Sequence, residues 1–254
     1  MIKAENVVKS YSQTNKAAEF KVIDGLSLSI DRGQKVGIVG QTGCGKSTFL
    51  RIVLGVEKPT AGRVLVDGRE PYRDYAFFKG KISAVFQEDR LLPWRTALDN
   101  VLIGPEIIDR DKKKAVEEAL NWLEMLGLSG FEKAYPSELS GGMRQRIAIA
   151  RALIVNPEVV LLDEAFGHLD EVTSRRLRSD FFEILEGRKT TVVMVTHNLD
   201  EALESVERVV VFGKPARVLG DFKTSDFNPV ELRRILQEII EKNVTYDSLA
   251  ATRV

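Results

Sequence analysis

Residues 35–48 read KVGIVGQTGCGKST, and this stretch indicates the fold class of the chain. Its second part matches G-x-x-x-x-G-K-[ST], the pattern of a phosphate-binding loop between a strand and a helix. The run Lys35–Val39 predicts that strand, and the apolar residues of Phe49–Leu54 predict the helix. Glycines at 40, 43 and 45 permit backbone conformations that let N–H groups point toward phosphate oxygens. This context favours a nucleotide-binding loop over an ordinary glycine-rich turn.

Two side chains of the loop bring the expected chemistry. Lys46 is placed to reach the β and γ phosphates of a nucleotide, and the Ser47 hydroxyl to ligate Mg²⁺. Cys44 occupies a free position of the pattern, and we interpret it as a small spectator rather than a redox group. The predicted nucleotide contacts of the loop are Gly40, Gln41, Thr42, Gly43, Cys44, Gly45, Lys46, Ser47 and Thr48.

Composition limits the class of protein. The chain has 254 residues, and its 37 Lys and Arg cancel its 37 Asp and Glu, which argues against a polybasic nucleic-acid-binding coat. The single cysteine rules out an internal disulfide framework and fits a reducing cytosol. The start of the sequence lacks an apolar signal core, and no apolar stretch approaches the length of a membrane span. We therefore expect a cytoplasmic protein that meets a membrane only from outside the bilayer.

The order of strand and helix patterns predicts an α/β fold. Leu26, Leu28 and Ile30 alternate with polar residues, and Gly62–Val66 ends at a turn, so an antiparallel β subdomain is expected near the N-terminus. Continuous apolar runs follow at Val159–Leu162, Thr191–Val195 and Val209–Phe212. Helical patterns at 171–186 and 198–206 separate them, which is typical of a mostly parallel core sheet.

Two further segments read as helical. Roughly 95–155 is expected to be a helical subdomain, because Val116, Ala119, Leu120, Leu123 and Leu126 recur at helical spacing within 112–126. The tail, 214–254, is expected to carry an amphipathic helix that begins at Pro229 after an Asn228 cap. Its apolar stripe is Val230, Leu232, Ile235, Leu236, Ile239 and Ile240. Packing of this helix on its own domain is favoured over a partner-binding face.

Polar residues at the ends of predicted strands suggest the rest of the site. Asp163 and Glu164 follow a buried strand, where a carboxyl edge would present them to a metal ion and an attacking water. A helix cap is the alternative for this pair. His197 follows Thr191–Val195 in the same manner and is a candidate γ-phosphate contact, although a lone strand-end histidine is often structural. Gln87 closes Ile82–Phe86, and its amide oxygen is a candidate ligand of the metal or the water.

These elements occur together with Leu139-Ser140-Gly141-Gly142-Met143, and the set resembles the ATP-binding cassette (ABC) ATPases over residues 1–213. The resemblance implies ATP hydrolysis with Mg²⁺ held by Ser47, Asp163 and Gln87. It implies Glu164 as catalytic carboxylate, Lys46 and His197 as catalytic partners, and Asp170 in the D-loop. Tyr11 would stack on adenine, and a half-buried strand aromatic is an equally good interpretation of that residue.

The signature motif points to a pair of chains. Ser140 and the two glycines would open a helix whose N–H groups form a second anion site. In the family, Ser140, Gly141, Gly142 and Met143 would contact the ATP bound by a second cassette, so we expect a homodimer. Hydrolysis would then weaken the closed pair and drive an opening motion.

A finer resemblance covers Gln87–Val101, which is similar to a segment of nitrate, sulfonate and taurine importer ATPases. It implies import of a small anionic solute, with a permease docking near Leu91, Leu92, Pro93 and Trp94 and a solute-binding protein acting indirectly. The location would be the cytoplasmic face of the membrane. The same apolar residues would pack under the helical subdomain in the alternative interpretation.

A soluble or exporter-associated ABC ATPase, of the lipid-transport, DNA-repair or cofactor-assembly type, is the alternative function. The chain has one phosphate loop and no sustained heptads, and its neutral charge does not favour nucleic acid. His168 lies beside the D-loop, where an exposed loop residue is the favoured interpretation.

Overall fold

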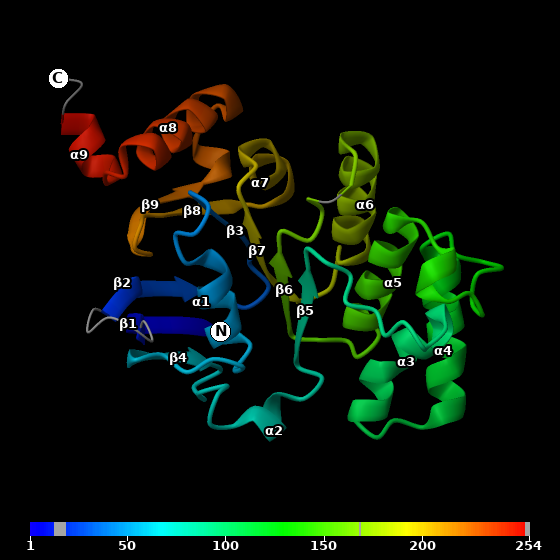
Figure 1. Cartoon of the computed structure of the whole chain (residues 1–254). Coiled ribbons are helices and arrows are strands. Elements are labelled where there is room, and N and C mark those ends of the chain that lie inside the picture. Colours follow the sequence, from blue (N-terminus) through cyan, green and yellow to red (C-terminus); the bar gives the residue numbers. More distant parts are fainter. Residues whose placement is uncertain (13–18, 168, 252–254) are drawn as a thin grey trace. The chain divides into compact units, whose positions relative to one another are not determined.

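The computed structural model describes residues 1–12, 19–167 and 169–251. The chain forms two compact units, one made of Met1–Phe77 with Thr191–Val254 and the other of Phe78–Thr190. Figure 1 shows both units with their helices and strands labelled. Within the described residues, no helix combines the length and the apolar character that crossing a bilayer requires.

The first unit begins with the predicted antiparallel sheet. Strands β1 (Ile2–Ser12), β2 (Glu19–Ile30) and β4 (Ala61–Val66) pair in the order β2-β1-β4. Leu26, Leu28 and Ile30 are buried while the serines between them are exposed, so the alternating pattern is confirmed.

The same unit holds the parallel strands that surround the glycine-rich loop. Strand β3 (Lys35–Gly40) lies between β7 (Thr191–Thr196) and β8 (Arg208–Phe212), and pairs with both in parallel. All of β7 and all but the first residue of β3 are buried, which explains their continuous apolar sequences. Strand β9 (Val218–Lys223), which the sequence reading did not predict, pairs with β8 in the antiparallel direction.

Helices follow the parallel strands as the α/β pattern predicts. Helix α1 (Lys46–Val53) comes after β3, and α7 (Leu199–Ser205) comes after β7. The tail adds a short 3₁₀ turn (Thr224–Asp226), α8 (Pro229–Lys242) and α9 (Tyr246–Ala251). The fold class is therefore confirmed as α/β with a parallel core and an N-terminal antiparallel sheet.

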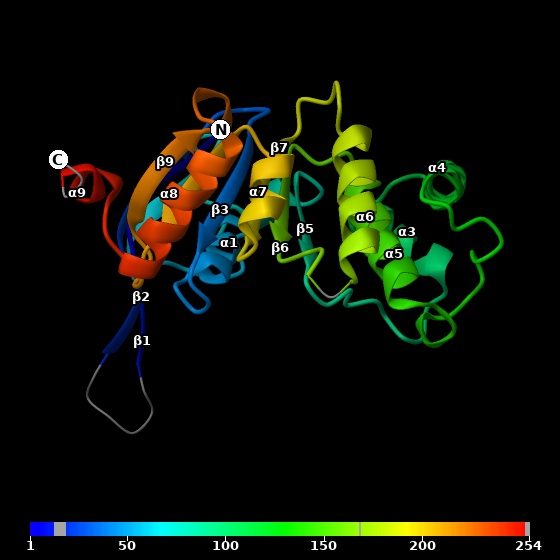
Figure 2. The same ribbon diagram turned by 90° about the horizontal axis from the view of Figure 1, so that it is seen from above.

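Helix α8 packs against α7 and β8 of its own unit, and Figure 2 shows it running beside α7. Asn228 caps it by accepting a hydrogen bond from the N–H of Val230 at 3.0 Å. Leu232, Ile235, Leu236 and Ile239 are buried, but the Val230 side chain is 78% exposed. The predicted stripe is thus wrong at Val230, because residues two positions apart do not share a helix face and Val230 lies away from the face that Leu232 buries.

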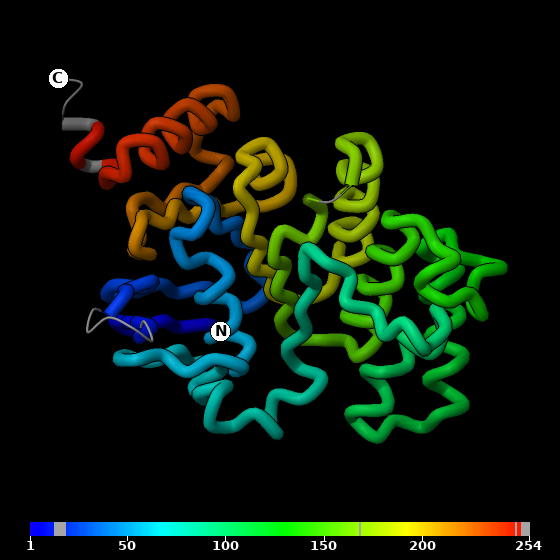
Figure 3. The backbone as a smooth tube through the Cα atoms, in the orientation of Figure 1, coloured from blue at the N-terminus to red at the C-terminus, as the bar shows by residue number. Residues whose placement is uncertain are grey.

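The second unit combines a parallel strand pair with helices. Strands β5 (Ile82–Phe86) and β6 (Val159–Asp163) pair in parallel, and α2 (Tyr75–Phe78) precedes them at the unit boundary. Helices α3 (Ala97–Ile107), α4 (Lys112–Met125) and α5 (Gly141–Leu153) pack together, as their path in Figure 3 shows. A 3₁₀ turn (Pro136–Glu138) precedes α5, and α6 (Glu171–Ile184) follows β6.

The buried face of α4 differs from the predicted one. Ala115, Ala119, Trp122 and Leu123 are buried, whereas Leu120 is 40% exposed. Small alanines at 115 and 119 allow close packing and centre the buried face near Trp122, so Leu120 lies outside it.

Candidate functional site

The glycine-rich loop between β3 and α1 holds a buried cation. Lys46 is 5% exposed, and its Nζ donates to the carbonyl oxygens of Gly40 at 2.8 Å and Gln41 at 3.2 Å. Gly45 has φ of 115°, and a Cβ there would lie 2.8 Å from the carbonyl oxygen of Val22. The loop therefore needs glycine at position 45. Its backbone carbonyls surround the Lys46 ammonium group.

The neighbouring residues place further groups at the helix start. Ser47 is half-buried in the first turn of α1, where N–H groups lack partners within the helix. Cys44 is 1% exposed, and burial raises the pKa of its thiol above the usual range, against the opposing charge of Lys46. A buried thiol that favours its neutral form fits the predicted spectator role.

Tyr11 belongs to a small polar cluster near α1. Its hydroxyl donates to the carboxylate of Glu57, and the Lys9 ammonium lies 3.1 Å from that carboxylate and 4.9 Å from the ring centroid. Burial, followed by the hydrogen bond to Glu57, raises the pKa of Tyr11, while Thr48 acts in the opposite direction. The ring is 38% exposed, so it has a free surface close to the loop. Sequence reasoning missed Glu57, which no motif marks.

His197 emerges at the same sheet edge as the loop. In the parallel pairing of β3 and β7, Val39 lies opposite Thr196, so Gly40 at the end of β3 and His197 after β7 leave the sheet at the same edge. His197 is exposed. The next residue, Asn198, caps α7, and its N–H donates to the Thr196 hydroxyl at 3.0 Å. These contacts fix the turn that carries the histidine.

The second unit places Gln87 beside the predicted acidic pair. Phe86 lies opposite Asp163 in the pairing of β5 with β6, so Gln87 and Glu164 leave the strands at one edge. Glu164 has φ of 50°, a conformation that is uncommon for a residue other than glycine. Its carbonyl oxygen accepts from the N–H of Gly167 at 3.0 Å, which closes a tight turn. Such a constrained backbone is frequent at functional sites.

The signature residues open α5 as predicted. The Ser140 hydroxyl accepts from the N–H of Met143 at 3.3 Å, and both Ser140 and Gly141 are exposed. Asp170 similarly caps α6 by accepting from the N–H of Thr173 at 3.0 Å, and hydrogen bonds from Thr173 lower the pKa of its carboxyl. His168 lies outside the described residues.

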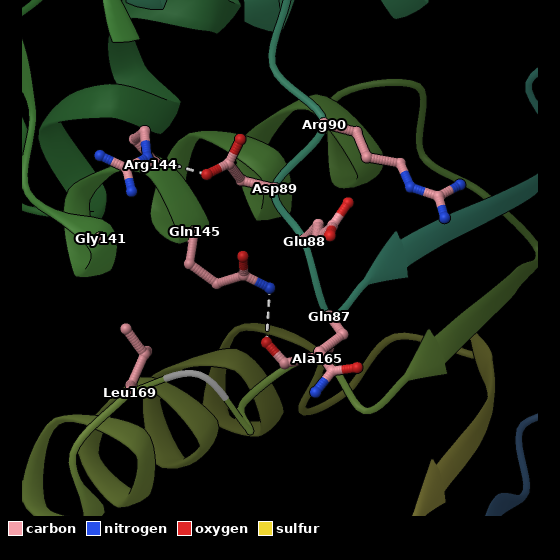
Figure 4. A pocket seen from close by; sticks show the side chains of 9 residues that line it. All are labelled: Gln87, Glu88, Asp89, Arg90, Gly141, Arg144, Gln145, Ala165 and Leu169. Atoms are coloured by element: carbon pink, nitrogen blue, oxygen red, sulfur yellow. Dashed lines mark hydrogen bonds and ion pairs between the residues drawn. The ribbon is translucent and has the colours of Figure 1, made fainter. Parts of the chain in front are cut away.

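The segment after β5, the start of α5 and the turn after β6 line a cavity of about 390 Å³ in the second unit. Figure 4 shows Gln87–Arg90 on one side and the start of α5 and the turn around Ala165 and Leu169 on the others. Gln145 is 4% exposed, and its amide donates to the carbonyl oxygens of Ala165 and, at 3.1 Å, Phe86. The Arg144 guanidinium pairs with Asp89 at 2.9 Å. Both residues directly follow the signature motif in the sequence, which assigned neither of them a role.

The apolar cluster after Gln87 divides between interior and surface. Leu91 is 9% exposed, so its predicted place on an exposed patch is wrong. Leu92 is half-buried, and its N–H donates to the side chain of buried Asn100 at 2.8 Å. Pro93 and Trp94 are exposed, and Trp94 has 71% of its surface in solvent. The exposed part of the cluster is thus limited to its last two residues.

Comparison with known proteins gives consistent matches. The family model described as ABC transporter matches residues 23–167. An uncharacterized ABC transporter ATP-binding protein of Methanocaldococcus jannaschii is 41% identical, and the match covers 85% of this chain and 79% of the relative. The aliphatic sulfonates import ATP-binding protein SsuB of Bacillus cereus is 38% identical, with 85% and 83% covered.

Two further matches extend this set. The bicarbonate transport ATP-binding protein CmpD of Synechocystis is 37% identical, with 92% of this chain and 82% of the relative covered. A solved dimer of an ATP-binding cassette in a post-hydrolysis state with ADP and Pi has a TM-score of 0.79 and 34% identity. That match covers 88% of this chain and 99% of the solved one.

Proposed function

The chain belongs to the ABC transporter family and is an ATP-binding, ATP-hydrolysing cassette, and from this premise we propose that it powers an importer of a small anionic solute. The single observation that supports the site best is the buried Lys46 ammonium within its loop. Two copies would work together beneath a permease, as peripheral subunits on the cytoplasmic face of the membrane. The solute class rests on the relatives named for aliphatic sulfonates and bicarbonate.

The residues divide the chemistry among them. Lys46 and the loop N–H groups neutralise and orient the phosphates of ATP, and Tyr11 offers its exposed ring to the adenine. Glu164 takes the proton of the attacking water, and Gln87 and His197 orient the water and the γ-phosphate. The tight turn at Glu164 sets the backbone position from which this carboxylate would reach the water.

The donor set of the site suits Mg²⁺. The Ser47 hydroxyl, the Asp163 carboxylate and the Gln87 amide would hold this ion, since Mg²⁺ prefers hard oxygen ligands. Across the described ranges, no group of three or more His, Cys, Asp or Glu side chains forms a metal cage. When bound, the ion neutralises charge on the phosphates.

The exposed start of α5 supports the pairing of two copies. Ser140 uses its hydroxyl to cap the helix, and the following N–H groups at an exposed helix start favour an anion. ATP held by one cassette would therefore be capped by the signature residues of the other. Loss of the γ-phosphate removes charge from this contact and releases the pair.

The paired-cassette proposal is tested with two variants. Lys46→Ala should abolish ATPase activity, because the phosphates lose their main cation. Glu164→Gln should bind ATP, hydrolyse it poorly and accumulate as a dimer in size-exclusion chromatography with light scattering. If Glu164→Gln stays monomeric with saturating ATP, the proposed pairing is wrong. Full turnover by Lys46→Ala would instead contradict the site assignment.

The permease contact is tested separately at Trp94. Trp94→Ala should spare the basal ATPase activity of the isolated chain, because the side chain is exposed and lies outside the residues assigned to hydrolysis. It should weaken association with the cognate permease. Met125→Ala, at an exposed apolar residue on α4 of the same unit, is the control. Equal co-purification of both variants with the permease would contradict docking at Trp94.

A further inference from the structure

Lys214 lies at the mouth of the phosphate loop. Phe212, the last residue of β8, lies opposite Gly40 in the parallel pairing with β3, so the chain after each strand leaves the same sheet edge. A Cβ placed on Gly43 would lie 3.9 Å from the Nζ of Lys214. Lys214 is exposed, and its ammonium makes no ion pair or hydrogen bond with any residue that the structure describes.

The backbone of Lys214 is nevertheless held firmly. Asn243, which follows α8 with φ of 53°, accepts from the N–H of Lys214 at 2.9 Å. Its Nδ2 also donates to the carbonyl oxygen of Lys214 at 3.2 Å. A Cβ on Gly213 would lie 2.9 Å from Asn243 Oδ1, so this close approach requires glycine. The position of Lys214 is therefore set by the end of α8.

The same helix end also contacts the loop directly. The Gln41 amide donates to the carbonyl oxygen of Ile240, in the last turn of α8, at 2.9 Å. Helix α8 is itself anchored by its buried apolar face and by the Arg233–Asp200 ion pair at 2.8 Å. The C-terminal segment thus contacts the loop at Gln41 and holds the backbone of Lys214.

The charge of Lys214 reaches the loop interior. Its ammonium, together with that of Lys46, opposes the burial effect that raises the pKa of the Cys44 thiol. The loop Gly40–Thr48 contains no acidic residue that would neutralise either lysine. A nucleotide polyphosphate is an anion that would use both cations, one buried at the base of the loop and one exposed at its rim.

We propose that Lys214 is a second phosphate-binding lysine of the nucleotide site, and that Asn243 at the end of α8 is its positioning residue. This inference rests on the proposed role of Gly40–Thr48 as the phosphate loop. It gives the C-terminal segment a task in substrate binding, because the segment carries the groups that hold Lys214 in place.

The test measures binding to the purified full chain by isothermal titration calorimetry. Lys214→Ala should weaken ATP, ADP and inorganic pyrophosphate about 5- to 10-fold, and Lys214→Arg should retain most of the affinity. Lys223→Ala is the matched control. Lys223 is exposed, and in the strand pairing of β8 with β9 it lies opposite Arg208, at the end of β8 that is far from Lys214. Affinities of Lys214→Ala within twofold of this control for all three ligands would overturn the proposal.

The positioning role has its own readout. Asn243→Gly keeps the backbone conformation accessible and removes the side chain. It should weaken the same three ligands, and the loss should disappear when Lys214 is already alanine, since Asn243 acts through that lysine. Additive losses in the double variant would refute positioning by Asn243.

Lys46→Ala distinguishes an error in the phosphate-loop assignment from an error in the role of Lys214. If it leaves pyrophosphate binding intact, the phosphate-loop assignment itself is wrong. If it abolishes that binding while Lys214→Ala does not alter it, only the role of Lys214 is refuted.

Discussion

Replacement of Gln145 by methionine tests how α5 holds the two halves of the catalytic edge in the second unit. Its amide donates to the carbonyl oxygens of Phe86 and Ala165, which adjoin Gln87 and Glu164 respectively. Methionine has similar length and no donor, so both hydrogen bonds disappear without a large cavity. The variant therefore removes the connection while it keeps the packing.

The expected cost follows from the burial of the group. Gln145 is 4% exposed, so the two carbonyls would lose their partner in a site that water reaches poorly. Each buried carbonyl left without its partner costs about 1–3 kcal/mol, so the two together should cost about 2–6 kcal/mol. With a slope of about 4 kcal/mol per molar, the guanidinium midpoint would fall by about 0.5–1.5 M.

Tryptophan fluorescence isolates the relevant unit. The chain has two tryptophans, Trp94 and Trp122, and both lie in the unit Phe78–Thr190. Trp122 is 8% exposed, so its emission should change when this unit unfolds. Glu117→Met, on the exposed face of α4, is the control and should shift the midpoint little, because it introduces the same side chain at a surface position.

Activity provides the second measurement. Loss of Gln145 should relax the direction of Gln87 and Glu164 and lower kcat about tenfold or more, with a smaller effect on KM. If the guanidinium midpoint of Gln145→Met lies within about 0.1 M of that of the control variant, the two carbonyls do not depend on this amide. Normal kcat in a destabilised variant would restrict Gln145 to a structural role.

Three further outcomes follow from the contacts. Burial raises the pKa of the Cys44 thiol, so the neutral thiol stabilises the folded chain. This stabilisation is complete below the unfolded pKa of about 8.5 and is lost as the pH rises above that value. Cys44→Ala should therefore make the free energy of unfolding, measured by circular dichroism, less dependent on pH in this range. A double-mutant cycle of Asp89→Ala and Arg144→Ala should give a coupling of about 0.5–1 kcal/mol in tryptophan-detected unfolding, and additive effects would contradict a working ion pair. Tyr11→Ala should lower ATP affinity about fivefold in calorimetry while Tyr11→Phe keeps it, and equal losses would contradict ring stacking.

Much of the fold follows from sequence periodicity. The run at Val159–Leu162 and the alternation at Leu26–Ile30 each report burial directly, since one strand is covered on both faces and the other on one. Strand β9 was missed because its burial is irregular, with Leu219 and Phe222 buried and the residues between them not. The errors at Leu120 and Val230 have other origins. Leu120 recurs at helical spacing, but an apolar residue at that spacing need not meet a neighbouring surface. Val230 lies two residues before Leu232, and residues two apart do not share a helix face.

The site residues that lie at the ends of strands were predictable from the sequence. Gln87 and Glu164, like Gly40 and His197, are brought to a common edge by parallel pairing, which the order of elements already implies. Residues that position these groups carry no such signal. Glu57 lies far from Tyr11 in sequence, and a buried glutamine inside a helix cannot be recognised from spacing alone.

The difference between strand-end residues and the residues that position them indicates how chains of one fold can differ in nucleotide affinity. Strand ends fix where the reactive groups emerge, because parallel pairing brings these positions to one edge. The groups that contact the loop or its neighbour from outside, the Ile240 carbonyl at Gln41 and Asn243 at Lys214, belong to the segment after β9. A change in that segment would alter nucleotide affinity without any change in the loop sequence, since its contacts with the loop pass through the end of α8.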